Sequence, residues 1–547
     1  MEQTERKAGI LLHPTSLPFT PGIGTIGKSA FAFLDWLNAA GMKVWQVLPL
    51  GPTGFGDSPY QSISTFALNP LLIDLDDLVS DGIAAKKQAR PPTEMQKGGK
   101  IDFGAVVKWK TNALKNIARS FLIKITNAQA DEKKAEQINT LKSDFHEFCA
   151  ENDFWLRDYA AFMSIKTFYD EKAQFESSQK KSSVNSMWNV YWEKSLSRHD
   201  EPAVENWINS HTEDFLTHEL IQFFAFRQWS ILRAYAKSKG IDIVGDIPIF
   251  VAPDSCDVWA NQKYFQLDDN RCFTKVAGVP PDYFSATGQL WGNPLYDWNA
   301  LKKDNYSWWI QRIKNTLKLV DYVRLDHFRG FEAYWAVPFG NKTAIEGEWL
   351  KGPGKDLFNA IKKELGTLPL IAEDLGVITD EVKDLRDSFD FPGMKILQFG
   401  FDKTELKNGA LKNAFLPHNY TTPNCVVYTG THDNDTAKGI LDTADDETLL
   451  LIASYLLGKP PKKKNIKKLR FSGKLCRRLV KLAFSSIAAT CIIPLQDVFE
   501  LGSGSRMNTP STSGTNWTWR AEPYMLTGLK ARQKGEWLKN MCILFNR

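Results

Sequence analysis

The chain has 547 residues, of which 43% are hydrophobic and 24% are charged, and its formal net charge is +5 at pH 7. This composition is that of an ordinary globular protein with a large core, and the length fits one barrel domain with insertions. Ten Lys and Arg residues lie in 459–478, which holds no acid, so the rest of the chain is net acidic and an overall basic footprint for nucleic acid is excluded.

The cysteines and the hydropathy of the sequence indicate the cellular compartment of the protein. The seven cysteines are scattered and form no CxxC pair, which argues against a zinc site and favours reduced thiols in the cytoplasm. The N-terminus lacks the apolar stretch of a signal peptide, and no run of about 18 apolar residues predicts a membrane helix. We therefore expect a cytoplasmic protein that binds neither membranes nor nucleic acid.

The first predicted elements form a strand–helix–strand unit. Residues 8–18 give a short strand and a loop, residues 29–43 space apolar side chains at helical intervals, and residues 44–64 give a second strand and a Gly/Pro-rich loop. Residues 75–215 are then dominated by Lys, Gln, Glu and Ala, with aromatic residues at helical intervals, which predicts a mostly helical insertion.

Six more apolar runs predict strands near residues 244, 323, 370, 396, 427 and 492, and helical patterns separate most of them. With the strands near residues 10 and 46, the chain holds eight strands in parallel-type units. This pattern predicts an α/β fold, a (β/α)8 TIM barrel with helical insertions. We expect one catalytic domain over 1–547, with the Gly-, Pro- and aromatic-rich region 251–300 as an active-site lid.

Acidic residues stand where three predicted strands end. Asp326 follows VRL, Glu373 follows LIA, and Asp433 follows the strand near residue 427. The C-terminal ends of barrel strands meet at one face, so these side chains are expected to lie together. Retaining cleavage of a glycosidic bond uses a carboxylate nucleophile and a carboxylic acid about 5–5.5 Å apart, and neighbouring strands about 4.8 Å apart can meet that separation.

Neighbouring residues suggest how the acids differ. Arg324 lies two residues before Asp326, so its side chain points to the same side of the strand and can keep that carboxylate ionised. Glu373 has no cationic neighbour in the sequence, which favours a raised pKa and the role of acid. In the alternative assignment Asp374 is the acid and Glu373 is structural.

Asp433 would be a third carboxylate that stabilises positive charge or binds ring hydroxyls, and His432 beside it can donate to a sugar hydroxyl. We expect His327 to be structural and Asp435 to cap a turn. Acids on separate strands can also bind Mg²⁺, but the sequence has no HExxH and no calcium-type loop. It also has no phosphate-binding glycine loop after a strand, so neither a metal nor a nucleotide cofactor is expected.

These residues belong to sequence blocks that resemble the 4-α-glucanotransferases of glycoside hydrolase family 77 (amylomaltase, disproportionating enzyme). The blocks run in the family's order over most of the chain: GILLHPTSLP, QVLPLGPTGFGDSPYQS, GDIPIFV, GVPPDYFS, GQLWGNPLYDW, VRLDHFRGF, IAEDLG, LQFGFD, FLPHNY, YTGTHDNDT, IPLQDV and RMNTP. The resemblance implies a barrel related to that of the α-amylases, without their C-terminal β-sandwich domain.

The resemblance also implies an activity that needs no cofactor. A family member cleaves an α-1,4 bond, holds the glucan on its nucleophile, and passes it to the 4-OH of another glucan or of glucose. Donors and acceptors would be α-1,4-glucans such as maltooligosaccharides, amylose and glycogen, in starch, glycogen or maltodextrin metabolism. A plain α-glucan hydrolase and a catalytically silent glucan-binding protein are the alternatives, and the retained acids argue against the second.

By this resemblance Asp326 is the nucleophile, Glu373 the acid/base and Asp433 the transition-state stabiliser. The implied substrate-binding residues are Arg324, His432, Asp246, Tyr60, Asp282, Tyr283, Phe284, Gln289, Trp291 and Asn508. Among them, Asp246 and Tyr60 would hold the sugar at the −1 subsite, and the five residues from Asp282 to Trp291 would form a lid on the acceptor side. The basic segment 459–478 departs from the family pattern and is predicted to be a solvated helix face, with a patch for a partner or an anionic surface as the alternative.

Overall fold

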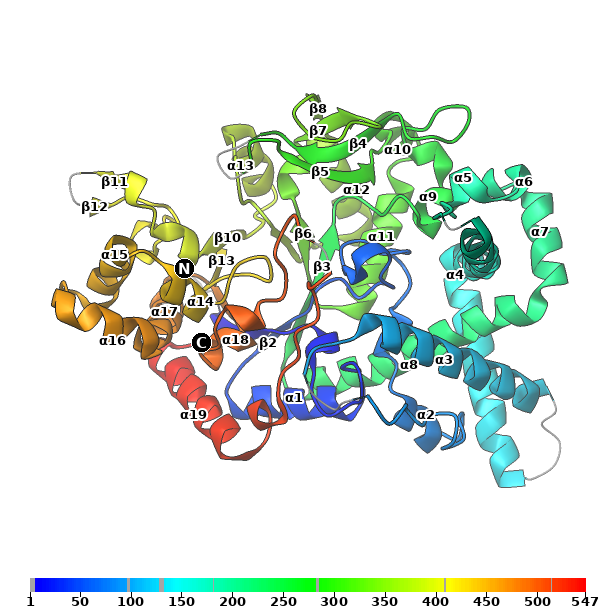
Figure 1. Cartoon of the computed structure of the whole chain (residues 1–547), viewed down its shortest axis with the longest axis horizontal. Helices are drawn as coiled ribbons and strands as arrows, with labels where there is room; N and C mark the ends of the chain where they lie inside the picture. The colour runs from blue at the N-terminus through cyan, green and yellow to red at the C-terminus, as the bar shows by residue number, and fades with distance from the viewer. Residues whose placement is uncertain are drawn as a thin grey trace.

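A barrel of eight parallel strands forms the centre of the computed structural model, which describes residues 5–95, 99–126, 132–180, 182–281, 285–407, 410–512 and 514–547 (Figure 1). The barrel strands are β1 (Lys7–Leu11), β2 (Val44–Gln46), β3 (Asp242–Pro248), β6 (Tyr322–Asp326), β9 (Leu370–Ala372), β10 (Gly393–Ile396), β13 (Cys425–Tyr428) and β14 (Thr490–Pro494). They stand in chain order, β14 pairs with β1, and the amide of Ala372 donates to the carbonyl of Pro392 at 2.9 Å, which links β9 to β10. The predicted (β/α)8 barrel and its eight strands are confirmed.

The inside of the barrel is a small apolar cluster, distinct from the main core that lies between barrel and helices. Its members come from seven of the eight strands: Leu11, Val44, Val244, Ile371, Met394, Ile396, Val426, Tyr428 and Ile492. Because successive side chains of a strand point to opposite faces, the residue two places after each inward residue also points inward. This alternation places Asp246, after Val244, and Glu373, after Ile371, above the cluster at the C-terminal ends of their strands.

Helices cover the barrel and form most of the segment between β2 and β3. That segment holds α2 (Leu75–Ser80), α3 (Phe103–Thr126), α4 (Glu132–Lys180), α5 (Trp188–Tyr191), α6 (Lys194–Ser197), α7 (Glu201–Ser210) and α8 (Thr212–Ser238), on the right of Figure 1. The other helices are α1 (Lys28–Ala39), α9 (Cys256–Ala260), α10 (Trp298–Lys303), α11 (Ser307–Leu319), α12 (Gly354–Leu365), α13 (Asp380–Asp387), α14 (Ala437–Thr443), α15 (Asp446–Leu457), α16 (Ile466–Phe471), α17 (Lys474–Ser485), α18 (Leu495–Val498) and α19 (Gly528–Phe545). Helices and turns, and no β-sandwich, make up what the structure describes beyond β14. No described helix is apolar over the length needed to cross a bilayer.

A four-stranded antiparallel sheet lies beside the barrel mouth, at the top of Figure 1. Its strands are β4 (Lys275–Val279), β5 (Gln289–Pro294), β7 (Ala333–Pro338) and β8 (Glu348–Lys351), in the order β5-β4-β7-β8. The sequence patterns predicted a loop region over 251–300 and did not predict this sheet. β5 contains Gly292, Asn293 and Pro294, which disfavour a strand locally, and β4 pairs with β7, which is distant in sequence. Two short strands, β11 (Leu406–Lys407) and β12 (Ala410–Leu411), form a separate hairpin.

The basic segment 459–478 covers α16 and the start of α17. Helix α17 buries Leu475, Cys476, Leu479 and Val480, while Lys474, Arg477, Arg478 and Lys481 are exposed at helical spacing. The positive charges therefore form the outer face of an amphipathic helix packed on the barrel, as expected for a solvated face.

Candidate active site

Arg324 joins two of the predicted acids at the ends of β3 and β6. In the parallel register of these strands Asp246 lies beside Arg324, and the alternation of side chains brings Asp326 to the same side. The guanidinium donates to both oxygens of Asp246, at 2.9 and 2.7 Å, and pairs with Asp326 at 2.8 Å. The side chains of Arg324 and Asp246 are 4% and 0% exposed, so these charges interact away from bulk water.

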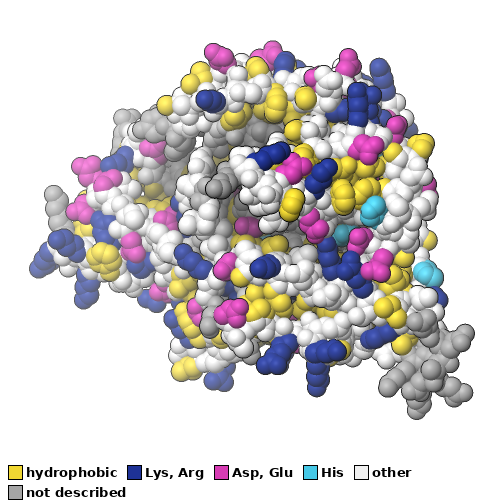
Figure 2. All heavy atoms as spheres, turned by 45° about the vertical axis from the view of Figure 1, so that its right-hand side comes forward, with side chains coloured by type: hydrophobic (Ala, Val, Ile, Leu, Met, Phe, Trp, Pro, Cys, Tyr) yellow, Lys and Arg dark blue, Asp and Glu magenta, His cyan; other side chains and the backbone are white. Residues whose placement is uncertain are grey.

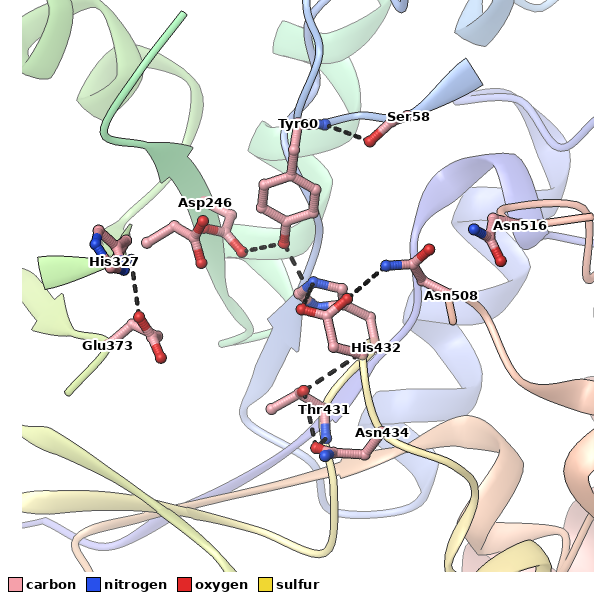
Figure 3. Close-up of polar contacts among 12 residues, drawn as sticks. Ser58, Tyr60, Asp246, His327, Glu373, Thr431, His432, Asn434, Asn508 and Asn516 are labelled. Atoms are coloured by element: carbon pink, nitrogen blue, oxygen red, sulfur yellow. Dashed lines mark hydrogen bonds and ion pairs between the residues drawn. The ribbon is translucent and has the colours of Figure 1, made fainter. Parts of the chain in front are cut away.

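Asp246 also accepts a hydrogen bond from the hydroxyl of Tyr60 at 2.8 Å (Figure 3). Burial raises the pKa of Asp246 to about 6, and the charge of Asp326 acts in the same direction, while Arg324 and the Tyr60 hydroxyl lower it. The two donors therefore hold a carboxylate in a place where burial alone would favour its neutral form.

Glu373 lies directly after β9, opposite Asp326 when the pairing of Leu325 with Ala372 is continued by one residue. Its carboxyl accepts the amide of His327 at 2.8 Å, and this contact is visible in Figure 3. His327 adopts a left-handed backbone (φ 50°) immediately after β6, which turns its amide toward Glu373. Burial raises the pKa of Glu373 well above 4.5, and the charge of Asp326 adds to the rise, although Arg324 lowers it.

Asp374, the alternative acid, is held by other parts of the chain. Its carboxyl pairs with Arg386 of α13 at 2.5 Å and accepts the backbone amide of Met394 in β10 at 2.7 Å. Both carboxyl oxygens are therefore engaged in linking β9, β10 and α13. This arrangement favours Glu373 over Asp374 as the residue that faces the site.

Asp433 sits in a cluster of donors after β13. Asn508 donates to one of its oxygens at 2.7 Å, and His432 lies 3.3 Å from the other. Arg506 donates to the backbone carbonyl of Asp433 at 2.5 Å and fixes the loop. Although burial raises the pKa of Asp433, its contacts with His432 and Asn508 and the charge of Arg324 bring that pKa below its usual value. Asp433 is thus held ionised.

Aromatic rings form one wall of the site. Tyr60 stacks on His432 with ring centres 4.9 Å apart, and Trp517 lies 5.9 Å from Tyr60 and 5.8 Å from His432. His13, at the end of β1, is buried nearby, and burial lowers its pKa to about 3, so it is neutral. The sequence analysis missed Trp517, Arg506 and His13, because no acidic residue or strand end marks the first two and only the position after β1 marks the third.

The antiparallel sheet supplies the other side of the mouth. Trp291 of β5 meets the ring of His327 edge-on at 4.8 Å and donates to Gln289 at 3.3 Å. Asp282, Tyr283 and Phe284, also predicted to bind substrate, lie outside the described residues.

The geometry therefore gathers Asp246, Arg324, Asp326, Glu373 and Asp433 at the C-terminal ends of four barrel strands. The face shown in Figure 2 is hollowed near its centre, with acidic side chains visible inside the hollow. Within the described ranges, no group of three or more His, Cys, Asp or Glu residues is arranged to hold a metal ion. Asp435, expected to cap a turn, accepts the amide of Thr436 at 2.7 Å and the hydroxyl of Ser503 at 2.7 Å.

Known proteins are similar to this chain in sequence and in fold over nearly its whole length. A family model described as 4-alpha-glucanotransferase matches residues 12–527. A 4-alpha-glucanotransferase of Synechocystis sp. is 44% identical over 532 residues, and one of Thermus thermophilus is 44% identical over 519 residues; each alignment covers 95% of both proteins. The solved amylomaltase from Streptococcus agalactiae in complex with acarbose superposes with a TM-score of 0.86 at 35% identity, over 99% of this chain and 100% of its own.

Proposed function

Because this chain belongs to the 4-alpha-glucanotransferase family, we propose that it transfers an α-1,4-glucan segment to the 4-hydroxyl of an acceptor glucan or of glucose, with retention of configuration. Maltooligosaccharides, amylose and glycogen are the proposed donors and acceptors. The observation that carries the proposal is that Asp326, held by Arg324 at 2.8 Å, lies across the β6–β9 register from Glu373, whose pKa is raised. An ion-paired carboxyl beside one whose pKa is raised fits the division of roles that a retaining mechanism needs.

In the first half of the reaction an oxygen of Asp326 bonds to C1 of the donor sugar while the C1–O4 bond breaks. Glu373 gives its proton to the departing O4, which leaves as the 4-hydroxyl of the released fragment. The product is a glycosyl ester on Asp326 and an ionised Glu373. In the second half Glu373 takes the proton of an acceptor 4-hydroxyl, whose oxygen bonds to C1 and releases Asp326.

Asp433 and Asp246 are proposed to act on the sugar without bonding to it covalently. Asp433, whose pKa is lowered by its donors, places negative charge beside the ring as it gains oxocarbenium character. Asp246 and Arg324 lie deep in the barrel mouth and would bind hydroxyls of the −1 sugar, with Tyr60 as its stacking face. His432 and Asn508 orient Asp433 and reach the same sugar.

Incubation of the purified protein with maltotriose tests this function. Glucose appearing together with maltodextrins longer than maltotriose is the expected result, since it requires transfer. Glucose and maltose without longer chains would mean hydrolysis, and no reaction with retained glucan binding would mean a silent binding protein; either result contradicts the proposal.

Transfer in preference to hydrolysis is proposed to depend on the acceptor side of the site. Trp291 packs against His327, next to the amide that contacts Glu373, so a bound sugar acceptor there excludes water from the glycosyl ester. Trp291→Ala is expected to raise the ratio of hydrolysis to transfer on maltotriose several-fold. An unchanged ratio would show that Trp291 does not control access of water.

A further inference from the structure

A second hollow lies outside the group of acids, between α10, the start of α12 and the end of β8. Its volume is about 420 Å³, and its wall includes Tyr296, Trp298, Asn299, Tyr306, Tyr334 and Asp356. This volume is in the range of sites that hold small molecules. We infer that this hollow is a non-catalytic binding site for an α-glucan chain. The identity of the ligand rests on the proposed function, and the position of the site rests on the geometry.

One wall is aromatic and firmly supported. Trp298 is half-buried, packs on Tyr296 at 4.9 Å, and stacks on the buried Trp309 at 6.2 Å. Tyr306 and Tyr334 are 4% and 3% exposed, so their rings are also fixed by packing. Tyr296, Tyr306 and Tyr334 are at most 4% exposed and support this wall from behind, and the half-buried Trp298 is the ring that can meet a ligand. A ring held in place offers apolar contact area without a loss of side-chain freedom on binding, and the C–H face of a glucose ring suits such a surface.

The other residues around the hollow include polar and charged side chains, with no excess of either charge. Lys302 of α10 and Asp356 of α12 form an ion pair at 2.5 Å, and Asp297 and Lys351 complete two acids and two lysines around the hollow. Asn299 is exposed, and no contact of its side-chain amide is found within the described ranges. A balanced set of charges with a free amide favours a neutral ligand rich in hydroxyls over an anion or a cation.

The backbone runs from the proposed acceptor side of the catalytic site to the hollow. Strand β5 carries Gln289 and Trp291 near the barrel mouth and continues into Tyr296, Asp297 and Trp298 in the wall of the hollow. At about 3.3 Å per residue, the seven steps from Trp291 to Trp298 span at most roughly 23 Å. A long glucan can therefore reach both places.

Binding stoichiometry tests the site directly. In Asp326→Asn protein, which cannot form the glycosyl ester, calorimetric titration with maltoheptaose is expected to show two binding events per chain. When Asn299→Trp is added, the larger side chain should occupy the hollow, and one of the two binding events is expected to disappear. Asn206→Trp, an exposed Asn on α7, is the matched control and should keep both. A single event in Asp326→Asn protein, or two events that survive Asn299→Trp, would overturn the inference.

Kinetics separate this inference from the proposed function. With Asp326 intact, Asn299→Trp is expected to leave the turnover of maltotriose unchanged and to raise KM for amylose about three- to tenfold. An unchanged KM for amylose with normal transfer would overturn the second site alone. Absence of transfer in the unsubstituted enzyme would overturn the proposed function alone, because the stoichiometry with maltoheptaose does not depend on turnover.

Discussion

Replacing Arg324 with Met tests the charge arrangement on which the site rests. The guanidinium makes three short contacts, two to Asp246 and one to Asp326, and it is almost completely buried. Met has a similar length and no charge, so the substitution leaves Asp246 buried and unpaired. Removing one partner of a buried ion pair costs about 3–5 kcal/mol, so a loss of this size in the free energy of unfolding is expected at pH 8.

The loss in the free energy of unfolding should depend on pH, and the pKa of Asp246 determines whether it grows or shrinks as pH rises. Burial raises the pKa of Asp246 to about 6 with Arg324 present, and Arg324 lowers it, so removing Arg324 raises it further. A carboxyl whose folded pKa lies above its unfolded value near 3.9 destabilises the fold increasingly as pH rises from the unfolded to the folded pKa. The variant should therefore go on losing stability above about pH 6, where the loss from Asp246 in the unsubstituted protein has levelled off. At pH 5 the carboxyl of Asp246 is protonated in the variant, and most of the loss should disappear.

Urea unfolding at pH 5 and pH 8 measures this effect, with Asp246→Asn as the second arm of a double-mutant cycle. Arg324→Met/Asp246→Asn is expected to recover most of the stability at pH 8, since no buried charge remains unpaired. It should not recover transfer, because Asp326 still lacks its cation. Equal losses at the two pH values, or no recovery in the double variant, would refute the reasoning.

Three further predictions follow from the same contacts. Asp326→Asn and Glu373→Gln should each lower the rate of transfer from maltotriose by at least about 10³-fold. The free energy of unfolding should change little, because each amide fits the space of the carboxyl it replaces. Activity within tenfold of the unsubstituted enzyme would exclude that residue from the chemistry. The charge of Asp326 raises the pKa of Glu373, so ¹³C NMR titration of Glu373 should give a lower pKa in Asp326→Asn protein, and an unchanged pKa would mean that the two carboxyls are not coupled. Asn508→Ala removes the side chain that donates to Asp433 at 2.7 Å and should lower kcat/KM about tenfold. The control is Asn424→Ala, just before β13, which loses a 3.0 Å hydrogen bond to the carbonyl of Asp390 and should leave kcat/KM unchanged.

The barrel could be predicted because its strands are short apolar runs that end in polar residues. β6 and β9 end abruptly at Asp326 and Glu373, and parallel strands bring such ends to one face. The spacing of Arg324 and Asp326 by two residues was enough to predict their salt bridge, since strand alternation is local. The contact of Arg324 with both oxygens of Asp246 could not be predicted from spacing, because it depends on the register between β3 and β6.

The remaining features depend on contacts between distant segments. The antiparallel sheet pairs β4 with β7, which are separated by the barrel strand β6, and its strands contain Gly and Pro. Trp517 reaches Tyr60 from near the end of the chain, and no local pattern distinguishes it from a core tryptophan. The preference for Glu373 over Asp374 depends on the position of Arg386 on α13. In each case the feature depends on tertiary packing, which cannot be predicted from the periodicity of the sequence.

The charge balance of the site explains why one arginine is combined with four carboxyls. Arg324 contacts Asp246 and Asp326, while His432 and Asn508 lower the pKa of Asp433 and desolvation raises the pKa of Glu373. Three carboxylates then surround one guanidinium, so the site has an excess of negative charge where the proposed transition state gains positive charge on the sugar ring. A second arginine beside Asp433 would cancel that excess. In the proposed mechanism an ionised Glu373 would add to it and would also remove the proton that the leaving oxygen needs, so the raised pKa of Glu373 would serve both the charge balance and the proton transfer.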